Sequence, residues 1–232
     1  MSLATDCAGF EGLGGLARYN PANGLFPTLQ GLSALNLGPF RVPNSGDFSN
    51  IATPNLVMAD CVDRLVLTVG SSVNLSYAMQ PIPAPPYTID FAGTCSGIMA
   101  VSSGFCQVGI GLSDGTKFWT LQAGSFNSIP RVLLEKWTNN TAVSVTPLSV
   151  GTLLDTQFHF LRITDDGTTL SAYISCNGKD YMLGFSEASN TFLTPTQWGV
   201  VTKNVTVAVT TDLLRAHVYN LAITNSILGD AP

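Results

Sequence analysis

The chain has 232 residues, of which 45% are hydrophobic and 11% are charged, less than half of the ~25% charged residues usual in soluble domains. Its net charge is −5 and no two of its ten Lys and Arg residues are adjacent, which argues against the clustered basic surface that nucleic-acid binding needs. No apolar run approaches the ~18 residues of a membrane span, and the N-terminus lacks the basic and apolar regions of a signal peptide, so we expect no membrane segment and no secretion.

Residues 1–60 form a first segment that is rich in glycine and proline. It contains eight Gly and five Pro residues, which interrupt helices and strands at short intervals. Apolar fragments such as Leu25-Phe26 and Leu37 lie between them, so the segment is too apolar for a solvated linker. We therefore predict an extended, mostly irregular N-terminal arm that packs on its own domain or on a neighbouring subunit.

The rest of the chain, residues 61–232, has the pattern of a β domain. Apolar and alternating runs predict strands at 64–69, 73–79, 87–91, 106–112, 117–122, 131–138, 142–146, 158–164, 170–176, 181–185, 198–202, 205–209 and 214–224. We expect the first two of these strands to pair with each other. No segment predicts a helix longer than a turn or two.

The connections between these strands carry turn signals. Residues 81–86 include four prolines and predict a polyproline-like connector, because proline cannot donate to a sheet ladder. Asp114-Gly115, Asp166-Gly167 and Asn177-Gly178 each lie between β-rich runs and are typical of tight hairpin turns. Closely spaced strands with hairpin turns predict an antiparallel sandwich or barrel.

The segment from Phe158 to Val201 carries a resemblance to a known family. It contains the runs Phe158 to Ile163 and Leu170 to Ser175, separated and followed by the Asp-Gly and Asn-Gly turns. This order resembles consecutive back-sheet strands of concanavalin A-like, laminin-G-like sandwiches, and the resemblance covers about residues 85–225. It implies an all-β fold, an antiparallel jelly-roll β-sandwich that follows the N-terminal arm. The low charge and the arm are further similar to sandwich domains of tailed-bacteriophage virion proteins.

No arrangement of residues predicts catalysis. Hydrolases of the resembled superfamily commonly carry E-x-D-x-x-E or E-x-x-E on one strand, and neither pattern occurs. The only glutamates, Glu11, Glu135 and Glu187, are far apart in sequence, whereas glycoside hydrolysis needs two facing carboxylates. His159 and His217 each lie between apolar neighbours in a predicted strand, which favours a structural role. We expect a non-enzymatic protein.

Metal and disulfide sites are also not expected. Asp165-Asp166 is the nearest candidate for calcium, and a hairpin turn explains it fully. The cysteines are Cys7, Cys61, Cys95, Cys106 and Cys176. Their odd number, wide spacing and lack of a CxxC motif predict small buried apolar residues in a reducing cytoplasm, and no cofactor.

One strand offers a weak glycan-binding candidate. Trp137 shares strand parity with Arg131, Leu133 and Glu135, which places these side chains on one face. An exposed Trp137 would stack on a sugar, with Arg131 and Glu135 as polar partners. The alternative is that Trp137 packs in the core or at a subunit contact.

Two main hypotheses about function follow. The first is a structural virion protein of a bacteriophage, such as a capsid-decorating, head-fibre, collar or tail-associated subunit, made in the host cytoplasm and located in the virion. It would contact other virion proteins and itself, as a trimer or a higher homo-oligomer. The alternative is a carbohydrate-binding module that recognises a bacterial surface glycan.

Overall fold

The computed structural model describes residues 41–52, 56–70, 72, 74–96, 104–126, 129–151, 158–206 and 214–227. Residues 1–40, which form most of the predicted arm and include Glu11 and Cys7, lie outside the described residues. Apart from one short 3-10 turn, η1 (Ser45–Asp47), the regular elements of the described part are β-strands. Within these residues, no helix is long and apolar enough to cross a membrane.

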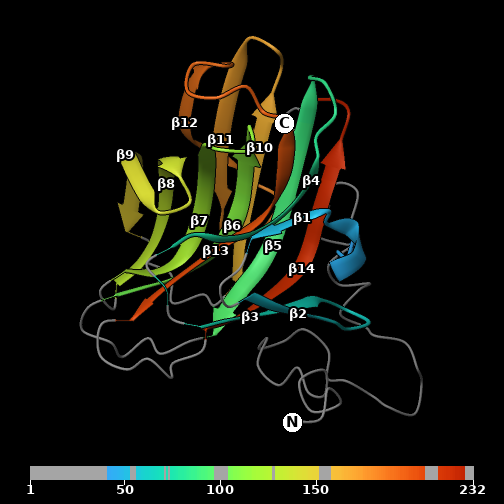
Figure 1. Ribbon diagram of the computed structural model, residues 1–232. Helices are drawn as coiled ribbons and strands as arrows, with labels where there is room; N and C mark the ends of the chain where they lie inside the picture. Colours follow the sequence, from blue (N-terminus) through green and yellow to red (C-terminus); the bar gives the residue numbers. More distant parts are fainter. Residues whose placement is uncertain are drawn as a thin grey trace.

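Two antiparallel seven-stranded sheets pack face to face (Figure 1). Sheet A has the order β1 (Asn50–Ala52), β4 (Ser76–Pro81), β13 (Gln197–Thr206), β6 (Gly104–Ser113), β7 (Phe118–Phe126), β8 (Ile129–Asn139) and β9 (Ala142–Gly151). Sheet B has the order β12 (Met182–Ala188), β11 (Thr169–Ser175), β10 (Phe158–Asp165), β5 (Tyr87–Ser96), β14 (Leu214–Thr224), β3 (Leu65–Val69) and β2 (Leu56–Asp60). The all-β sandwich expected from the sequence is therefore confirmed.

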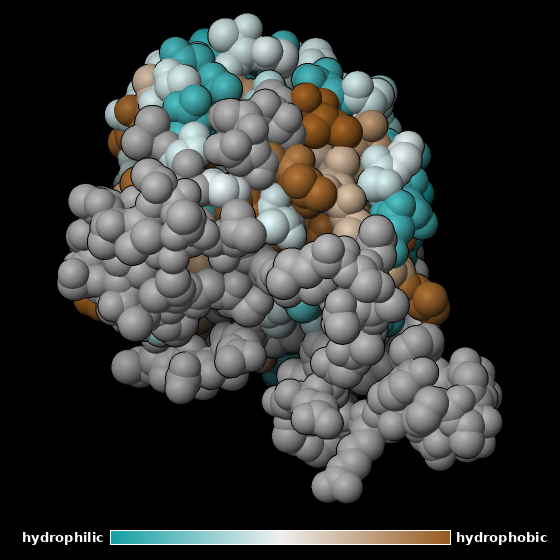
Figure 2. Space-filling model, turned by 60° about the horizontal axis from the view of Figure 1, so that its bottom comes forward, coloured by the Kyte–Doolittle hydropathy of each residue, from teal (hydrophilic) through white to brown (hydrophobic). Residues whose placement is uncertain are grey.

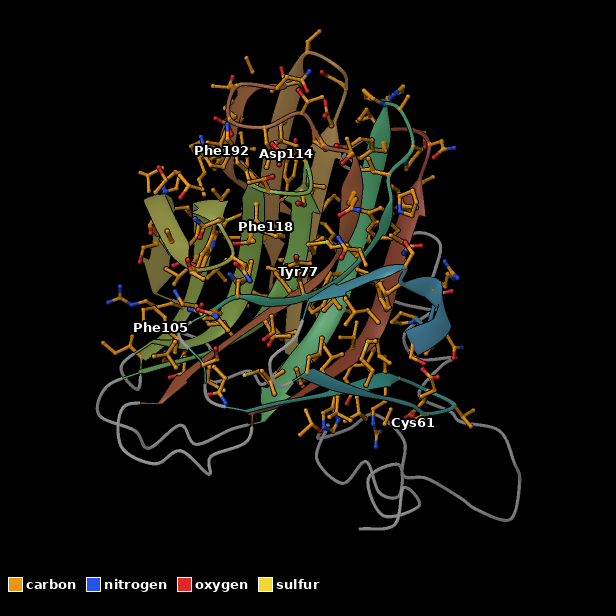
Figure 3. The ribbon with its side chains drawn as sticks, viewed as in Figure 1. Cys61, Tyr77, Phe105, Asp114, Phe118 and Phe192 are labelled. Carbon is orange, nitrogen blue, oxygen red and sulfur yellow. The ribbon has the colours of Figure 1, made fainter. Side chains whose placement is uncertain are left out.

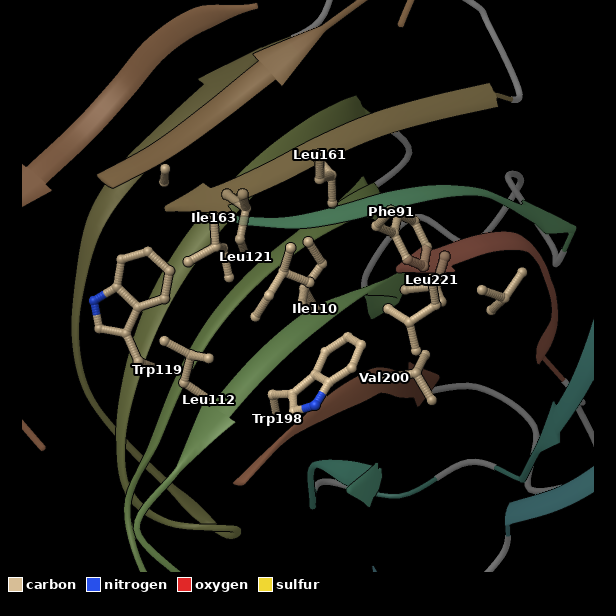
Figure 4. Close-up of a cluster of buried hydrophobic side chains, with 14 of the residues drawn as sticks. Phe91, Ile110, Leu112, Trp119, Leu121, Leu161, Ile163, Trp198, Val200 and Leu221 are labelled. Carbon is tan, nitrogen blue, oxygen red and sulfur yellow. The ribbon is translucent and has the colours of Figure 1, made fainter. Parts of the chain in front are cut away.

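The core lies between the two sheets and is built from alternate residues of each strand. In β10, Leu161 and Ile163 face the core, whereas Arg162 faces away and pairs with Asp90 of β5. The same alternation brings Trp119, Trp198 and other bulky apolar side chains together in one cluster (Figure 4). Strands of period two thus bury one face on the partner sheet, which is the arrangement expected for a sandwich.

The predicted hairpins are confirmed. The turns with Asp114-Gly115, Asp166-Gly167 and Asn177-Gly178 join β6 to β7, β10 to β11 and β11 to β12, and their glycines have φ angles of 98°, 90° and 73°. These positive angles favour glycine, which explains the dipeptides. The strands of the segment that carries the resemblance, β10, β11 and β12, are consecutive neighbours in sheet B.

Three details of the strand prediction are wrong. β3 and β4 do not pair, because the chain crosses from sheet B to sheet A between them. The predicted strand 198–202 and the described part of 205–209 belong to one strand, β13, which pairs with β6 from Gln197 to Thr206, whereas residues 207–209 lie outside the described residues. β1 and β2 lie at 50–52 and 56–60, inside the predicted arm, and pair with β4 and β3. Short strands at sheet edges have little periodicity, so their sequence gave no signal.

The cysteines do not all behave as expected. Cys61 is disulfide-bonded, so the prediction that no cysteine forms a disulfide is wrong. Distance along the sequence does not limit which cysteines meet in space. Cys176 is exposed in the β11–β12 turn, whereas Cys106 is buried and Cys95 is partly buried. Only two of the described cysteines therefore fit the expectation of small interior residues.

Candidate functional site

Sheet A curls strongly away from the core. β4 and β7 are separated by β13 and β6, so a flat sheet would hold them about 14 Å apart. Yet the rings of Tyr77 and Phe118 on these strands have centroids 4.6 Å apart. The backbone N–H of Leu75, just before β4, donates to the carbonyl of Asn140 in the β8–β9 turn at 2.7 Å. The outer face of sheet A, here called the curled face, therefore closes on itself.

Glycines make this curl sterically feasible. A Cβ atom at Gly109 of β6 would lie 2.0 Å from the carbonyl oxygen of Leu121, and one at Gly199 of β13 would lie 2.0 Å from that of Ala78. No side chain can occupy such a position without moving the neighbouring strand. Glycine at these two positions lets adjacent strands approach closely, which is one of the uses of glycine inside a strand.

The curled face encloses a second apolar cluster. Its members share burial and lie on four strands or beside them: Leu75, Tyr77, Met79, Phe118, Trp137 and Val201. Figure 3 shows Tyr77 and Phe118 on this face, with Phe105 farther along it. The cluster is separate from the core between the sheets. Sheet A thus has buried side chains on both faces.

A charged pair lies beside this cluster. Lys203 Nζ of β13 is 3.4 Å from Glu135 Oε1 of β8, although β6 and β7 lie between the two strands. The ammonium group also lies 4.0 Å from the Phe105 ring centroid and 4.6 Å from that of Trp137. Burial raises the pKa of Glu135 and lowers the pKa of Lys203, and each partner's charge opposes the shift of the other.

Thr120 of β7 links Gln122 of the same strand to Glu135 and Trp137 of β8. Its hydroxyl oxygen accepts from Gln122 Nε2 at 3.0 Å and from Trp137 Nε1 at 3.3 Å, and the hydroxyl donates to the backbone carbonyl of Glu135 at 3.3 Å. Gln122 Nε2 also lies 3.5 Å from Glu135 Oε2. A hydrogen-bond network of charged, amide and hydroxyl side chains therefore extends along the curled face from the aromatic cluster.

Two amide groups on this face have unused hydrogen-bonding capacity. Both polar atoms of the Gln107 amide, and Oε1 of Gln122, are buried and find no hydrogen-bond partner within the described part of the chain. Gln107 is paired in register with Lys203, and Gln122 lies beside Gly109. A buried amide without a partner costs about 1–3 kcal/mol, so such atoms mark a position where a polar ligand or water would be stabilising.

The structure brings two of the three predicted glycan-binding residues together. Trp137 and Glu135 lie on the curled face, where the Lys203 ammonium group approaches both side chains, and Arg131 lies farther along the same face of β8. Trp137 is only 1% exposed, so the predicted exposed stacking platform is wrong and the alternative, a packed Trp, is correct. Arg131 Nη1 donates to Ser149 Oγ of β9 at 3.0 Å.

The partners of these residues could not be predicted from the sequence. Lys203, Gln107 and Gln122 come from three other strands, and only the strand order of sheet A places them opposite Glu135. In β6, Gly109 and Gly111 alternate with the apolar residues Val108, Ile110 and Leu112. That alternation does not say which strands are neighbours.

The curled face carries few acidic side chains. Glu135 is the single acidic residue in the strands of sheet A, all of which the structure describes. Glu187 lies elsewhere, on β12, where it accepts from Trp119 Nε1 at 2.8 Å and pairs with Lys136. Among the described residues, no group of three or more His, Cys, Asp or Glu side chains could hold a metal ion.

Asp165, Asp166 and His217 contact neighbouring residues of the sandwich. Asp166 Oδ1 accepts three hydrogen bonds from Thr168 and Thr169 within the hairpin turn, which lower the pKa of its carboxyl group. Asp165 accepts from Tyr87, Gly167 and Ser189. His217 lies in β14 with Nδ1 3.5 Å from the Tyr219 hydroxyl, and the His159 side chain lies outside the described set.

No protein-family model matches the chain, and no curated protein matches it. Solved structures do. The carbohydrate-binding module CBM66 from Bacillus subtilis has a TM-score of 0.51 at 16% identity, and the match covers 80% of this chain and 99% of that one. A legume lectin-like domain from Entamoeba histolytica has a TM-score of 0.53 at 11% identity, covering 83% of this chain and 98% of the other.

A GH43 protein from Bacillus licheniformis, BlXynB, has a TM-score of 0.54 at 12% identity; the match covers 70% of this chain and 33% of that protein. This chain therefore spans about a third of BlXynB. Identities this low establish likeness of fold alone. The neighbours and the two antiparallel sheets together identify the fold as a concanavalin A-like, jelly-roll β-sandwich.

Proposed function

We propose that the chain is a carbohydrate-binding protein whose ligand is a sugar residue held on the curled face. The observation that carries this proposal is the pair of buried amides with unused hydrogen-bonding atoms, Gln107 and Gln122, beside Glu135 and Lys203. Sugar hydroxyls both donate and accept, so they match amide, carboxylate and ammonium groups. The half-buried ring of Phe105 supplies apolar surface for the C–H face of a sugar.

The dimensions of the face favour a small ligand. Glu135 and Lys203 already meet across the curl, and their side chains are only 4% and 7% exposed. A long polysaccharide segment does not fit between groups that touch each other. We therefore propose a terminal sugar residue, whose hydroxyl groups would hydrogen-bond to the amides of Gln107 and Gln122 beside the charged pair. The lectin-like and carbohydrate-binding names of two structural neighbours support this class of ligand.

The test combines binding with stability. A glycan array followed by calorimetric titration should identify a glycan that the full-length chain binds. Replacing Gln107 by Leu should weaken binding about tenfold, because the amide loses its contact with the ligand, yet leave stability unchanged or raised, because a buried unpaired amide is removed. Gln80→Leu, on the opposite face of sheet A, is the matched control and should bind normally. Unchanged binding by Gln107→Leu would contradict the proposed site.

We further propose that the curled face binds without cleaving. Hydrolysis of a glycoside with the usual mechanism needs a second carboxylate about 5–10 Å from the first, and Glu135 is the single acidic residue in the strands of this sheet. An assay for released reducing ends on any glycan that binds should detect none. Cleavage that Glu135→Gln abolishes would overturn this proposal.

A second candidate function is structural assembly, as a subunit of a larger particle such as a bacteriophage virion. The observation that favours it is the row of exposed apolar side chains on the last strand of each sheet, β9 and β12. The members are Val143, Val145, Val150, Met182 and Leu183, with exposed fractions between 40% and 70%. Hydrophobic residues also reach the surface on the face turned forward in Figure 2. The virion itself is supported only by the sequence resemblance.

A further inference from the structure

Two free cysteines face each other across the sandwich. Cys95 lies on β5 of sheet B and Cys106 on β6 of sheet A, and the strand parity of each places it on the core side. Their sulfur atoms are 3.0 Å apart, and the Cys95 thiol also lies 3.2 Å from the carbonyl oxygen of Cys106. A disulfide requires about 2.05 Å between the sulfurs, so an approach of about 1 Å would close the bond.

The surroundings hold the two thiols together. Cys106 is 8% exposed and packs with Val69, and Leu56 and the partly buried Cys95 contact the same cluster. Both strands are fixed by their neighbours, since Cys95 is in register with Ala216 and Cys106 with Ser125 and Asn204. The two sulfurs are therefore close because two ordered sheets place them there, and little rearrangement separates the dithiol from a disulfide.

We propose that Cys95 and Cys106 form a site of oxidative modification, at which a disulfide covalently joins sheet A to sheet B. The disulfide would connect β5 to β6 and form a covalent ring with the chain between residues 95 and 106. Cys61 is already disulfide-bonded, so the chain carries a bond of the same kind elsewhere. Cys176, the remaining free cysteine among those described, is exposed in the β11–β12 turn.

The reaction is a thiol–disulfide exchange with a disulfide oxidant, such as oxidised glutathione or an oxidised dithiol oxidoreductase. One thiolate attacks the oxidant and releases a thiol; the second thiolate then displaces the remaining half of the oxidant. The two cysteines lose two electrons and two protons, and the oxidant is reduced to two thiols. The hydrogen bond with Cys106, and after it burial, raise the pKa of Cys95, so the reaction should be slow at neutral pH and faster in alkaline solution.

The experiment uses the full-length chain, with oxidised glutathione as the probe. After oxidation, free thiols are alkylated under denaturing conditions, and a peptide map is read by mass spectrometry. We expect the peptides of Cys95 and Cys106 to be joined, with a mass loss of two hydrogen atoms. The melting temperature should rise on the order of 5 °C, because the bond constrains the unfolded chain. The Cys176→Ser variant should behave in the same way.

Three outcomes would overturn the proposal. One is that Cys95 and Cys106 are both still alkylated after oxidation under conditions that keep the Cys61 bond. Another is that Cys95 is found joined to Cys176 or to glutathione alone. The third is that Cys95→Ala shows the same rise in melting temperature on oxidation as the unsubstituted chain. If Cys95→Ala does not fold, the peptide map of the unsubstituted chain decides the question alone.

Discussion

Glu135 and Lys203 carry opposite charges into a part of sheet A that is shielded from solvent. Burial disfavours both charges, which is why the pKa of Glu135 is raised and that of Lys203 is lowered. Their contact at 3.4 Å offsets part of this cost, and the rings of Phe105 and Trp137 contribute a cation–π contact to the ammonium group. A pair of this kind is costly to break from one side only.

Lys203→Met should therefore destabilise the chain by about 3 kcal/mol near pH 8, since it leaves the buried Glu135 carboxylate without its partner. The raised pKa of Glu135 means that the folded state holds its proton more tightly than the unfolded state. Stability is then lost as pH rises through the folded-state pKa, so the variant should recover stability between about pH 8 and about pH 5. Urea unfolding at the two pH values measures the difference.

The double variant Glu135→Gln, Lys203→Met provides the control for this prediction. It lacks both titrating groups, so its stability relative to the unsubstituted chain should depend less on pH than that of Lys203→Met. An equal loss of stability at both pH values for the single variant would show that Glu135 does not titrate in this range. The pair would then be less shielded than its geometry indicates.

Arg162 and Asp90 form a second buried ion pair, on the outer face of sheet B. Arg162 Nε and Nη2 donate to the two Asp90 oxygens at 2.7 and 3.3 Å, and the guanidinium stacks 3.9 Å from the Tyr181 ring centroid. Lysine can reproduce neither the two-pronged contact nor the planar stacking. Arg162→Lys should cost about 2 kcal/mol in chemical denaturation.

Arg41→Lys is the matched control for Arg162→Lys. Arg41 pairs with Asp47, but its side chain is 53% exposed, so the same substitution should change stability by less than about 0.5 kcal/mol. Equal effects of the two substitutions would mean that the two-pronged contact and the ring stacking of Arg162 add nothing to the stability of the folded chain.

At the scale of elements, the sequence predicts strands better than it predicts their partners. The β10–β11–β12 meander follows from local signals, because Asp166-Gly167 and Asn177-Gly178 join strands that are adjacent in both sequence and space. β13 lies between β4 and β6, both distant in sequence, and no local pattern encodes that order. Strand parity predicts that Glu135 and Trp137 share a face, because both lie on one strand. The contact of Glu135 with Lys203 depends on the strand order of sheet A, so it could not be predicted.

The curl of sheet A depends on close strand contacts at glycine. Gly109→Ala would place a Cβ atom 2.0 Å from the Leu121 carbonyl oxygen, which forces β6 and β7 apart and opens the curled face. We expect a loss of at least about 2 kcal/mol in unfolding free energy and weaker glycan binding. Gly46→Ala is the control, because an added Cβ atom there meets nothing within 4 Å. A fully stable Gly109→Ala would show that the strands can separate without cost.

At the scale of the whole molecule, the side of the sandwich formed by β9 and β12 exposes apolar side chains and carries little charge. β9 ends sheet A and β12 ends sheet B, and the two edges adjoin, since a Cβ atom at Gly184 would lie 3.0 Å from Leu148 Cδ2. Natural edge strands are usually protected by charged residues. β9 has none, and β12 has only Glu187, which already pairs with Lys136. Exposed apolar side chains on edges with so little charge favour contact with another chain.

Self-association through this side should therefore respond to charge placed on β12. We expect the full-length chain to form oligomers in sedimentation analysis, and Met182→Lys with Leu183→Lys to shift it towards monomer, because burying two unpaired charges in an apolar contact is costly. Val62→Lys, at an apolar side chain that is 75% exposed but lies between β2 and β3, should not change the distribution. A monomeric unsubstituted chain, or an equal effect of Val62→Lys, would contradict assembly through β9 and β12.

Because the curled face and these edges use different residues, glycan binding should survive the change on β12, which allows the two proposed functions to be tested separately.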